Sequence, residues 1–248
     1  MTDLPEVGTR VSLRYRLPAG ETPPHSDVVG HLVDTGATVR VRTRRGDIVE
    51  VKPADVLAVR VVPEMPVRTG DIRNLEHAAA LAWPGTEHAW LGEWLARFGN
   101  GSTRRANSAV PLRFTSYAEI ATVADWYSSR GVPALISAPD RLLRIPPGVP
   151  TDAENLVMAT DIDADVTGPA DLVVSLHPDH RWLQIYEREV PVEVLTAVVD
   201  GEVAFAALDD AAVGRGAVTE APDGTRWAGI SAVHVSEHAR RRGLARAL

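Results

Sequence analysis

Residues 227–248 limit the fold of this chain more than any other stretch. Residues 227–235 form an apolar run with no helical period, which predicts a strand. Three consecutive arginines at 240–242 follow, then Gly243, and together they predict the start of a helix. The first backbone amides of a helix lack intrahelical acceptors, and the helix dipole adds about half a positive charge there. A strand leading into such a start is typical of a phosphate-binding site, and Gly243 and Ala245 would let a ligand approach the backbone.

Two common phosphate-binding motifs are absent from this stretch. It contains neither the G-x-x-x-x-G-K-[ST] of a P-loop nor the G-x-G-x-x-G of a dinucleotide-binding turn. Through Arg240, Gly243 and Ala245 it resembles the pyrophosphate-binding motif of the GNAT superfamily of N-acetyltransferases, [Q/R]-x-x-G-x-[G/A]. The alternative interpretation is a surface helix whose arginines are simply solvated.

The order of predicted elements before the motif also resembles the GNAT core. The patterns predict a strand at 172–176, a helix capped by Asp179, a short helix opened by Pro191, and strands at 203–208, 212–219 and 227–235. Strand, two helices, three antiparallel strands and a helix make up the first two thirds of that fold. The chain ends at Leu248 inside the last predicted helix, so we expect a C-terminally truncated GNAT core, inactive alone, over residues 166–248.

The resemblance implies transfer of an acetyl group from acetyl-CoA to a primary amine by direct attack on the thioester. The pantetheine of the cosubstrate would pair with the predicted strand near Val233 and Val235. The phosphates would bind the residues that follow, which are Arg240, Arg241, Arg242, Gly243, Leu244, Ala245 and Arg246.

An alkylammonium acceptor must lose a proton before it can attack. For a pKa of about 10.4, presenting the neutral amine at pH 7 costs roughly 4 to 5 kcal/mol, so a nearby base is useful. His234, within the predicted strand, and Glu237, at its end, are the candidate catalytic bases. Strand alternation points His234 away from the side of Val233 and Val235, and positioning of the reactants could supply most of the rate without a base.

Residues 1–62 predict a separate domain, an SH3-like β-barrel. Apolar and polar residues alternate in several short segments, with a tight turn at Gly46. Arg40, Arg42 and Arg44 share one face by the period of two. This face supports an alternative function, a non-catalytic protein that binds nucleic acid or a protein partner. Nucleic acid is the less favoured ligand because no aromatic side chain is interleaved to stack on bases.

Residues 67–165 predict a degenerate GNAT-like region of helices and βαβ units, so the whole chain reads as α+β with a mixed sheet and flanking helices. Asp71 and Ser116 each predict a helix N-cap, and strands are expected at 105–112, 134–137 and 156–160. Asn107 is a candidate for lining the acceptor cleft, or else a buried turn asparagine. A second helix capped by Thr86 and ended by Gly99 is predicted from large side chains at helical spacing, namely Trp90, Leu91, Trp94, Leu95 and Phe98.

Metal binding is not expected. Asp161, Asp163 and Asp165 open like an EF-hand loop, but Val166 stands where that loop needs glycine. His177, Asp179 and His180 are interrupted by a proline and read as a strand-to-helix loop. The absence of cysteine excludes disulfides and thiolate zinc sites, and with no signal-like N-terminus it favours a cytoplasmic location.

Charge is divided unevenly along the chain. Residues 150–230 carry 16 acidic and 4 basic side chains, whereas residues 231–248 carry 4 arginines and 1 glutamate. Such a division would suit a cationic acceptor and an anionic cosubstrate, although charge for solubility explains it equally well. Lys52 is the only lysine beside 25 arginines among the 26 basic residues, which suggests a GC-rich bacterial genome.

Overall fold

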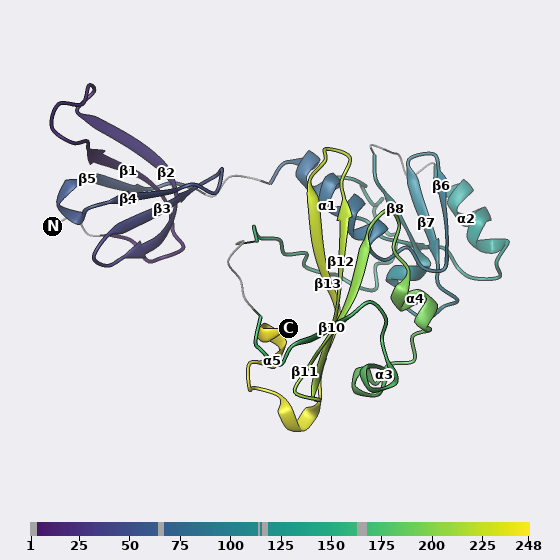
Figure 1. Ribbon diagram of the computed structural model, residues 1–248. Coiled ribbons are helices and arrows are strands. Elements are labelled where there is room, and N and C mark those ends of the chain that lie inside the picture. The colour runs from purple at the N-terminus through teal and green to yellow at the C-terminus, as the bar shows by residue number, and fades with distance from the viewer. Residues whose placement is uncertain (1–3, 64–66, 114, 116–118, 163–167) are drawn as a thin grey trace. The chain divides into compact units, whose positions relative to one another are not determined.

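The computed structural model describes residues 4–63, 67–113, 115, 119–162 and 168–248 (Figure 1). The chain divides into two compact units, residues 1–66 and residues 67–248. Each unit has its own hydrophobic core.

The first unit is a five-stranded antiparallel sheet with strand order β4-β3-β2-β1-β5. Its strands are β1 (Arg10–Arg16), β2 (His25–Thr35), β3 (Val39–Thr43), β4 (Ile48–Val51) and β5 (Val56–Val61), with a 3-10 turn (Pro53–Asp55) between the last two. Alternate residues of the strands enter the core, among them Val11, Leu13, Leu32, Val39 and Val41, all fully buried.

The first unit was predicted to be an SH3-like β-barrel, and its sheet does not close into a barrel among the described residues. Strands β4 and β5 form the two edges of the sheet and do not pair with each other among the described residues. Strand β2 changes register between Leu32 and Asp34, as a β-bulge does, and a bulge bends its strand. Glycine is required at Gly30, since a Cβ there would lie 2.0 Å from the carbonyl oxygen of Arg42.

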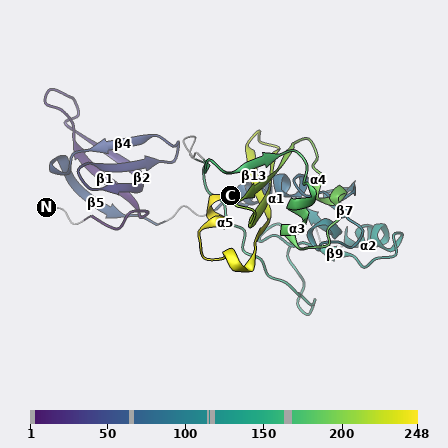
Figure 2. The same ribbon diagram turned by 60° about the horizontal axis from the view of Figure 1, so that its bottom comes forward.

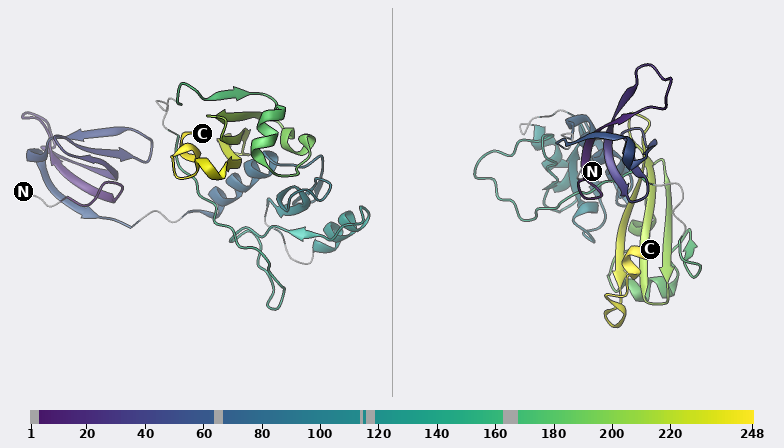
Figure 3. Two further views of the ribbon diagram at one scale, coloured as in Figure 1. Left: turned by 90° about the horizontal axis from the view of Figure 1, so that it is seen from below. Right: turned by 90° about the vertical axis from the view of Figure 1, so that its left-hand side faces the viewer.

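The second unit contains two four-stranded sheets, seen from further directions in Figures 2 and 3. The first has the order β6-β7-β8-β9, in which β8 and β9 are parallel and the other pairs antiparallel. Its elements are α1 (Thr69–Leu81), β6 (Glu87–Leu91), β7 (Trp94–Phe98), a 3-10 turn (Arg105–Asn107), β8 (Ser108–Pro111), α2 (Ile120–Ser128) and β9 (Leu135–Ile136).

The helix predicted from Thr86 to Gly99 is wrong, because these residues form the β6–β7 hairpin. Gly92 turns the chain with φ 60°, and Leu91 pairs with Trp94. Trp94 packs in one cluster with Val123 and Tyr127, whereas Leu95 packs in another with Val110 and Leu112 on the opposite face. A strand buried on both faces carries continuous apolar residues, which imitate a buried helix.

Other predicted elements of this region differ in their bounds. Asp71 lies in the first turn of α1, and Arg68 occupies the N-cap. The carboxylate of Asp71 accepts a hydrogen bond of 3.0 Å from the amide of Arg68. The strand predicted from residue 105 begins at Ser108. Residues 156–160 form no strand, and Leu156 is 86 % exposed. Ser116, predicted to cap α2, lies outside the described residues, as do Asp163 and Asp165.

The last sheet follows the predicted order of elements. It runs β10-β11-β12-β13, with neighbours antiparallel. Its elements are β10 (Val173–Ser175), α3 (His180–Tyr186), α4 (Val192–Thr196), β11 (Glu202–Leu208), β12 (Ala212–Glu220), β13 (Arg226–Val235), a 3-10 turn (Glu237–Ala239) and α5 (Leu244–Ala247). The final helix is much shorter than the predicted one, which began near Ala239.

Helices α3 and α4 cover one face of this sheet. Trp182 and Leu195 from the helices pack with Phe205 and Val213 from the strands in a common core. The other face, which we call the open face, is a shallow hollow lined by Val174, Ala204, Ala206, Gly214, Gly216 and Ile230, with Leu248 beside it. The C-terminal helix lies on the side of the open face (Figure 1).

Candidate functional site

A β-bulge in β13 shapes the end of the last sheet. Val213 pairs with His234 and Arg215 with Ser231, so Ala232 and Val233 together oppose the single residue Gly214. Ala232 adopts a left-handed conformation with φ 51°. The extra residue changes which side chains face the helices, because strand alternation restarts after a bulge.

His234 and Val233 lie on opposite faces of the sheet, as successive residues of a strand do. His234 shares the helix-covered face with its pairing partner Val213, and its side chain is 18 % exposed. Val233 is 42 % exposed and approaches Gly214 from the open face. Among the described residues β13 pairs only with β12, so its outer edge keeps unpaired backbone groups.

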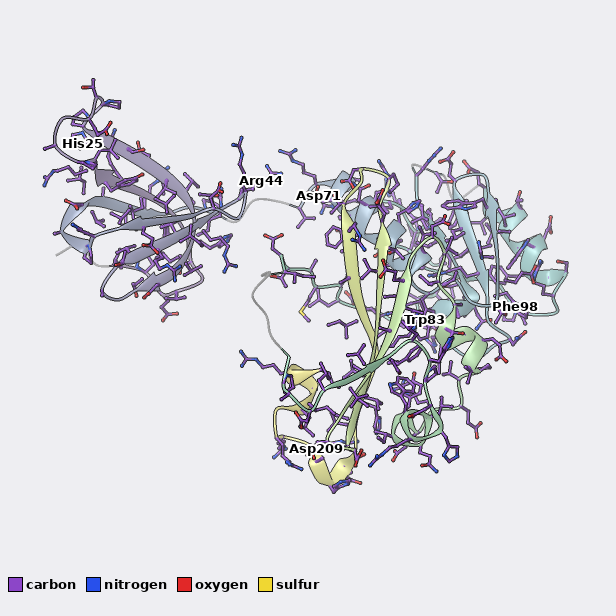
Figure 4. All side chains as sticks on the ribbon, viewed as in Figure 1. His25, Arg44, Asp71, Trp83, Phe98 and Asp209 are labelled. Carbon is purple, nitrogen blue, oxygen red and sulfur yellow. The ribbon has the colours of Figure 1, made fainter. Side chains whose placement is uncertain are left out.

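The chain after β13 packs against the end of the sheet where β11 turns into β12. The amide of Ser236 donates to the carbonyl of Ala211 over 2.8 Å, and the Arg240 guanidinium donates to the carbonyl of Val235 over 3.3 Å. Arg242 forms an ion pair of 3.2 Å with Asp209, which lies at the lower end of the sheet in Figure 4. These contacts hold the arginine segment against the ends of β12 and β13.

The backbone amides of residues 241–245 donate to no acceptor within the described residues. Arg241 and Gly243 have positive φ values of 63° and 83°. Arg240, just before them, is extended, with φ −63° and ψ 158°. Backbone amides without a protein acceptor can donate to an anion. A Cβ at Gly243 would meet nothing within 4 Å, so the space beside this turn is open.

The two candidate bases lie in different surroundings. The Nε2 atom of His234 is buried and has no hydrogen-bond partner, and it lies 3.6 Å from Oε2 of Glu187 at the end of α3. Glu237 is exposed in the turn after β13, where its carbonyl oxygen accepts a hydrogen bond of 3.3 Å from the amide of Arg240. Of the two, His234 is the one that lies beside the end of a helix, α3.

Asn107 lies in the loop before β8, and its side chain closes that loop. Its Oδ1 accepts hydrogen bonds of 3.0 Å from the amides of Gly99 and Gly101, and its Nδ2 donates to the carbonyl of Thr103 over 2.6 Å. Asn107 as a whole is 8 % exposed. All of these contacts are those of a buried turn residue.

Two charged residues of this region were not singled out by the sequence patterns. Glu187 is the residue that ends α3 and faces His234. Arg215, on β12, is only 1 % exposed, and burial lowers its pKa to about 10. A single arginine between Gly214 and Gly216 in an otherwise apolar strand was the available signal, since a charge at such a position must be buried with partners.

No group of three or more histidine or carboxylate side chains able to hold a metal occurs within the described part of the chain. Asp179, considered above as a ligand by type, caps α3 by accepting a hydrogen bond of 2.7 Å from the amide of Trp182. No helix among the described residues is long and apolar enough to cross a membrane.

Comparison with known proteins assigns a family to both units. Residues 69–248 match the family described as "Probable histone acetyltransferase Rv0428c C-terminal", and residues 5–60 match "Rv0428c N-terminal Sm-like domain". The chain therefore belongs to the Rv0428c-like family, and its first unit is Sm-like where an SH3-like domain was predicted.

One relative shows the similarity over most of the chain. The probable histone acetyltransferase Rv0428c of Mycobacterium tuberculosis is 47 % identical over 240 residues, an alignment that covers 96 % of this chain and 78 % of the relative. No solved structure matches the chain significantly.

Proposed function

We propose that this protein is an acetyl-CoA-dependent N-acetyltransferase of the GNAT type, with its cosubstrate-binding residues within 166–248. The observation that carries the proposal is the row of unpaired amides at 241–245, which follows a bulged edge strand and a short 3-10 turn. The name of the mycobacterial relative and the order of elements from β10 to α5 support the same reading.

The cosubstrate would bind along β13 and its following turn. The pantetheine would pair with the free edge of β13 near Val233 and Val235, as an added strand does. The diphosphate would accept hydrogen bonds from the amides of the turn and charge-assisted bonds from its arginines. The residues proposed for this role are Arg240, Arg241, Arg242, Gly243, Leu244, Ala245 and Arg246. When bound, acetyl-CoA supplies an activated acetyl thioester.

The acceptor in this proposal is a primary amine, and the relative's name favours a lysine of a basic protein. The excess of carboxylates over residues 150–230 would attract such a cationic substrate. His234 is the proposed base, because its ring lies at the bulge with one unpartnered nitrogen. Glu237 is the alternative base, and Asn107 is not needed for this mechanism.

Acetyl-CoA titration by calorimetry tests the proposal. Gly243→Glu should abolish saturable binding, because a carboxylate would stand where the phosphates bind and would repel them. Gly224→Glu is the matched control, since Gly224 has φ 82° against 83° for Gly243 and is equally open, but lies at the turn between β12 and β13. Equal binding by both variants would overturn the proposed cosubstrate site.

A non-catalytic binding role for the Sm-like unit receives less support. Arg40, one of the three arginines on the predicted basic face, forms an ion pair of 3.1 Å with Glu50 on the neighbouring strand. This pairing reduces the free positive charge of the face. Reversal of Arg40 and Arg44 to glutamate should leave acetyl-CoA binding unchanged. Salt-sensitive retention of nucleic acid that these reversals abolish would favour the binding role.

A further inference from the structure

His234 and Glu187 form an unusual pair in the last sheet. A buried ring nitrogen of the histidine has no hydrogen-bond partner, although a carboxylate lies close to it. Nε2 of His234 forms no hydrogen bond, and Oε2 of Glu187 is 3.6 Å away. The Glu187 side chain is 65 % exposed, so it can move the few tenths of an ångström that a hydrogen bond requires. Helix α3, which bears Glu187, lies beside the lower part of the sheet in Figure 1.

The backbone of Glu187 is held in an unfavourable conformation. Glu187 ends α3 with φ 57° and ψ 17°, the left-handed region that glycine adopts without steric cost. Its amide donates to the carbonyl of Leu183 over 3.3 Å, as the residue that closes a helix does. A glycine would close α3 more favourably, so the position bears a carboxylate against the local backbone preference.

A carboxylate on one nitrogen of a neutral imidazole decides which nitrogen carries the proton. With Nε2–H directed at Glu187, the lone pair remains on Nδ1, and Nδ1 becomes the proton acceptor. Nε2 is the His234 nitrogen that is buried without a hydrogen-bond partner, which leaves Nδ1 as the nitrogen able to take a proton. We propose that Glu187 is a positioning residue that fixes the His234 ring and its tautomer, so that Nδ1 can deprotonate the acceptor amine.

This inference rests on the proposed acetyltransferase function. The acceptor ammonium gives one proton to Nδ1 of His234, and the neutral nitrogen then forms a bond to the acetyl carbonyl carbon. The carbon–sulfur bond breaks, and the departing thiolate takes the second proton that the nitrogen loses. His234 returns its proton to water, with the exposed Glu187 carboxylate stabilising the charged ring until it does.

Three variants of the full chain test the role of Glu187. Glu187→Gln keeps the shape but lets the side chain donate to Nε2, and should lower kcat by about tenfold to a hundredfold with the KM for acetyl-CoA unchanged. Glu187→Gly removes the carboxylate and relieves the left-handed backbone, so kcat should fall while the unfolding midpoint stays or rises. Glu189→Gln, two residues away and also exposed, is the charge-matched control and should retain wild-type kcat.

Coupling between the two residues gives a second kinetic readout. His234→Gln should lower kcat at least as much as Glu187→Gln, and the double variant should be no worse than His234→Gln alone, because Glu187 acts only through the ring. Full additivity of the two losses would overturn the inference.

Nitrogen-15 NMR of the histidine rings supplies a readout independent of catalysis. The His234 signals, assigned by their absence in His234→Gln, should show the Nε2–H tautomer in the wild type and lose it in Glu187→Gln. Unchanged signals would overturn the role of Glu187 even if acetyl transfer is normal. A wild-type protein that binds acetyl-CoA and shows the tautomer but transfers no acetyl group would instead refute the proposed function.

Discussion

Arg215 of β12 donates a hydrogen bond from Nη2 to the carbonyl oxygen of Ala82, the residue that ends α1, over 2.9 Å. The same guanidinium donates to the carbonyls of Leu195 and Ala197 at the end of α4, over 2.5 Å and 2.8 Å. It also lies over the ring of Trp83, labelled in Figure 4, at 4.5 Å from the ring centre. The C-terminal carbonyls of two helices, which carry partial negative charge, therefore replace a carboxylate as its partner.

Replacement of Arg215 by methionine should destabilise the second unit by about 3 kcal/mol, because two buried carbonyls and a partly buried one would lose their donor. Urea unfolding followed by tryptophan fluorescence measures this change. The control is Arg226→Met on β13, where the arginine is exposed and pairs with Glu202 at 3.4 Å. Its loss should cost less than about 0.5 kcal/mol. Equal losses for the two variants would contradict the structural role of Arg215.

Two glycines of the β6–β7 hairpin differ in the space around them: Gly85 precedes β6, and Gly92 lies in the turn. Gly85 has φ 76°, and a Cβ there would lie 2.5 Å from the carbonyl oxygen of Phe98. Gly85→Ala should therefore cost well over 1 kcal/mol, since both backbone strain and a backbone clash oppose it. Gly92→Ala, at φ 60° with nothing within 4 Å, should cost only about 1 kcal/mol. Thermal unfolding measures both changes, and a stabilising effect of Gly92→Ala would contradict the turn, because alanine stabilises a helix interior relative to glycine.

The last sheet was predictable from the sequence because its signals are local. Asp179 caps α3 as its position before an apolar helical stretch indicates, and Pro191 precedes α4. The turn at Gly224 separates β12 from β13, two segments rich in residues that favour strands. In each case the residue that sets the element lies within it or next to it, so no distant contact is required.

The hairpin and the bulge were not predictable because they depend on distant partners. Trp94 is buried against α2 on one face of the sheet and Leu95 against α1 on the other, and this two-sided burial erased the period of two. Gly92 was the one local sign of a turn within the supposed helix. The extra residue at Ala232 appears only once β13 pairs with β12, so the bulge could not be read from the sequence, whereas the opposite directions of His234 and Val233 agree with the alternation predicted.

Glu76 on α1 should weaken folding when it is charged. Burial raises its pKa above 4.5, and Arg97 and Arg105 oppose that shift to a smaller extent. The folded state then holds the proton more tightly than the unfolded state, so stability falls as pH rises through the raised pKa. Glu76→Gln should be more stable than wild type at pH 7, and the difference should vanish below about pH 4. Urea midpoints at pH 4, 5.5 and 7 measure it.

The control for Glu76 is Glu87, an exposed carboxylate whose pKa is shifted in the opposite direction. A hydrogen bond from Arg130 lowers the pKa of Glu87, so its contribution is present above the ordinary pKa and is lost as pH falls. Glu87→Gln should therefore be slightly less stable than wild type at pH 7 and equal to it in acid. Parallel pH dependence for the two variants would show that burial does not govern Glu76.

Asp179 should act on the candidate site only through the stability of α3. Its carboxylate accepts from the amide of Trp182 over 2.7 Å, and Asp179→Ala should cost about 1 kcal/mol of the free energy of unfolding. Asp179→Asn keeps an acceptor and should cost a few tenths of a kcal/mol. Because Glu187 closes the other end of the same helix, both variants should retain wild-type kcat once the folded fraction is taken into account. A fall in kcat at full folding would mean that Asp179 itself contacts the substrate.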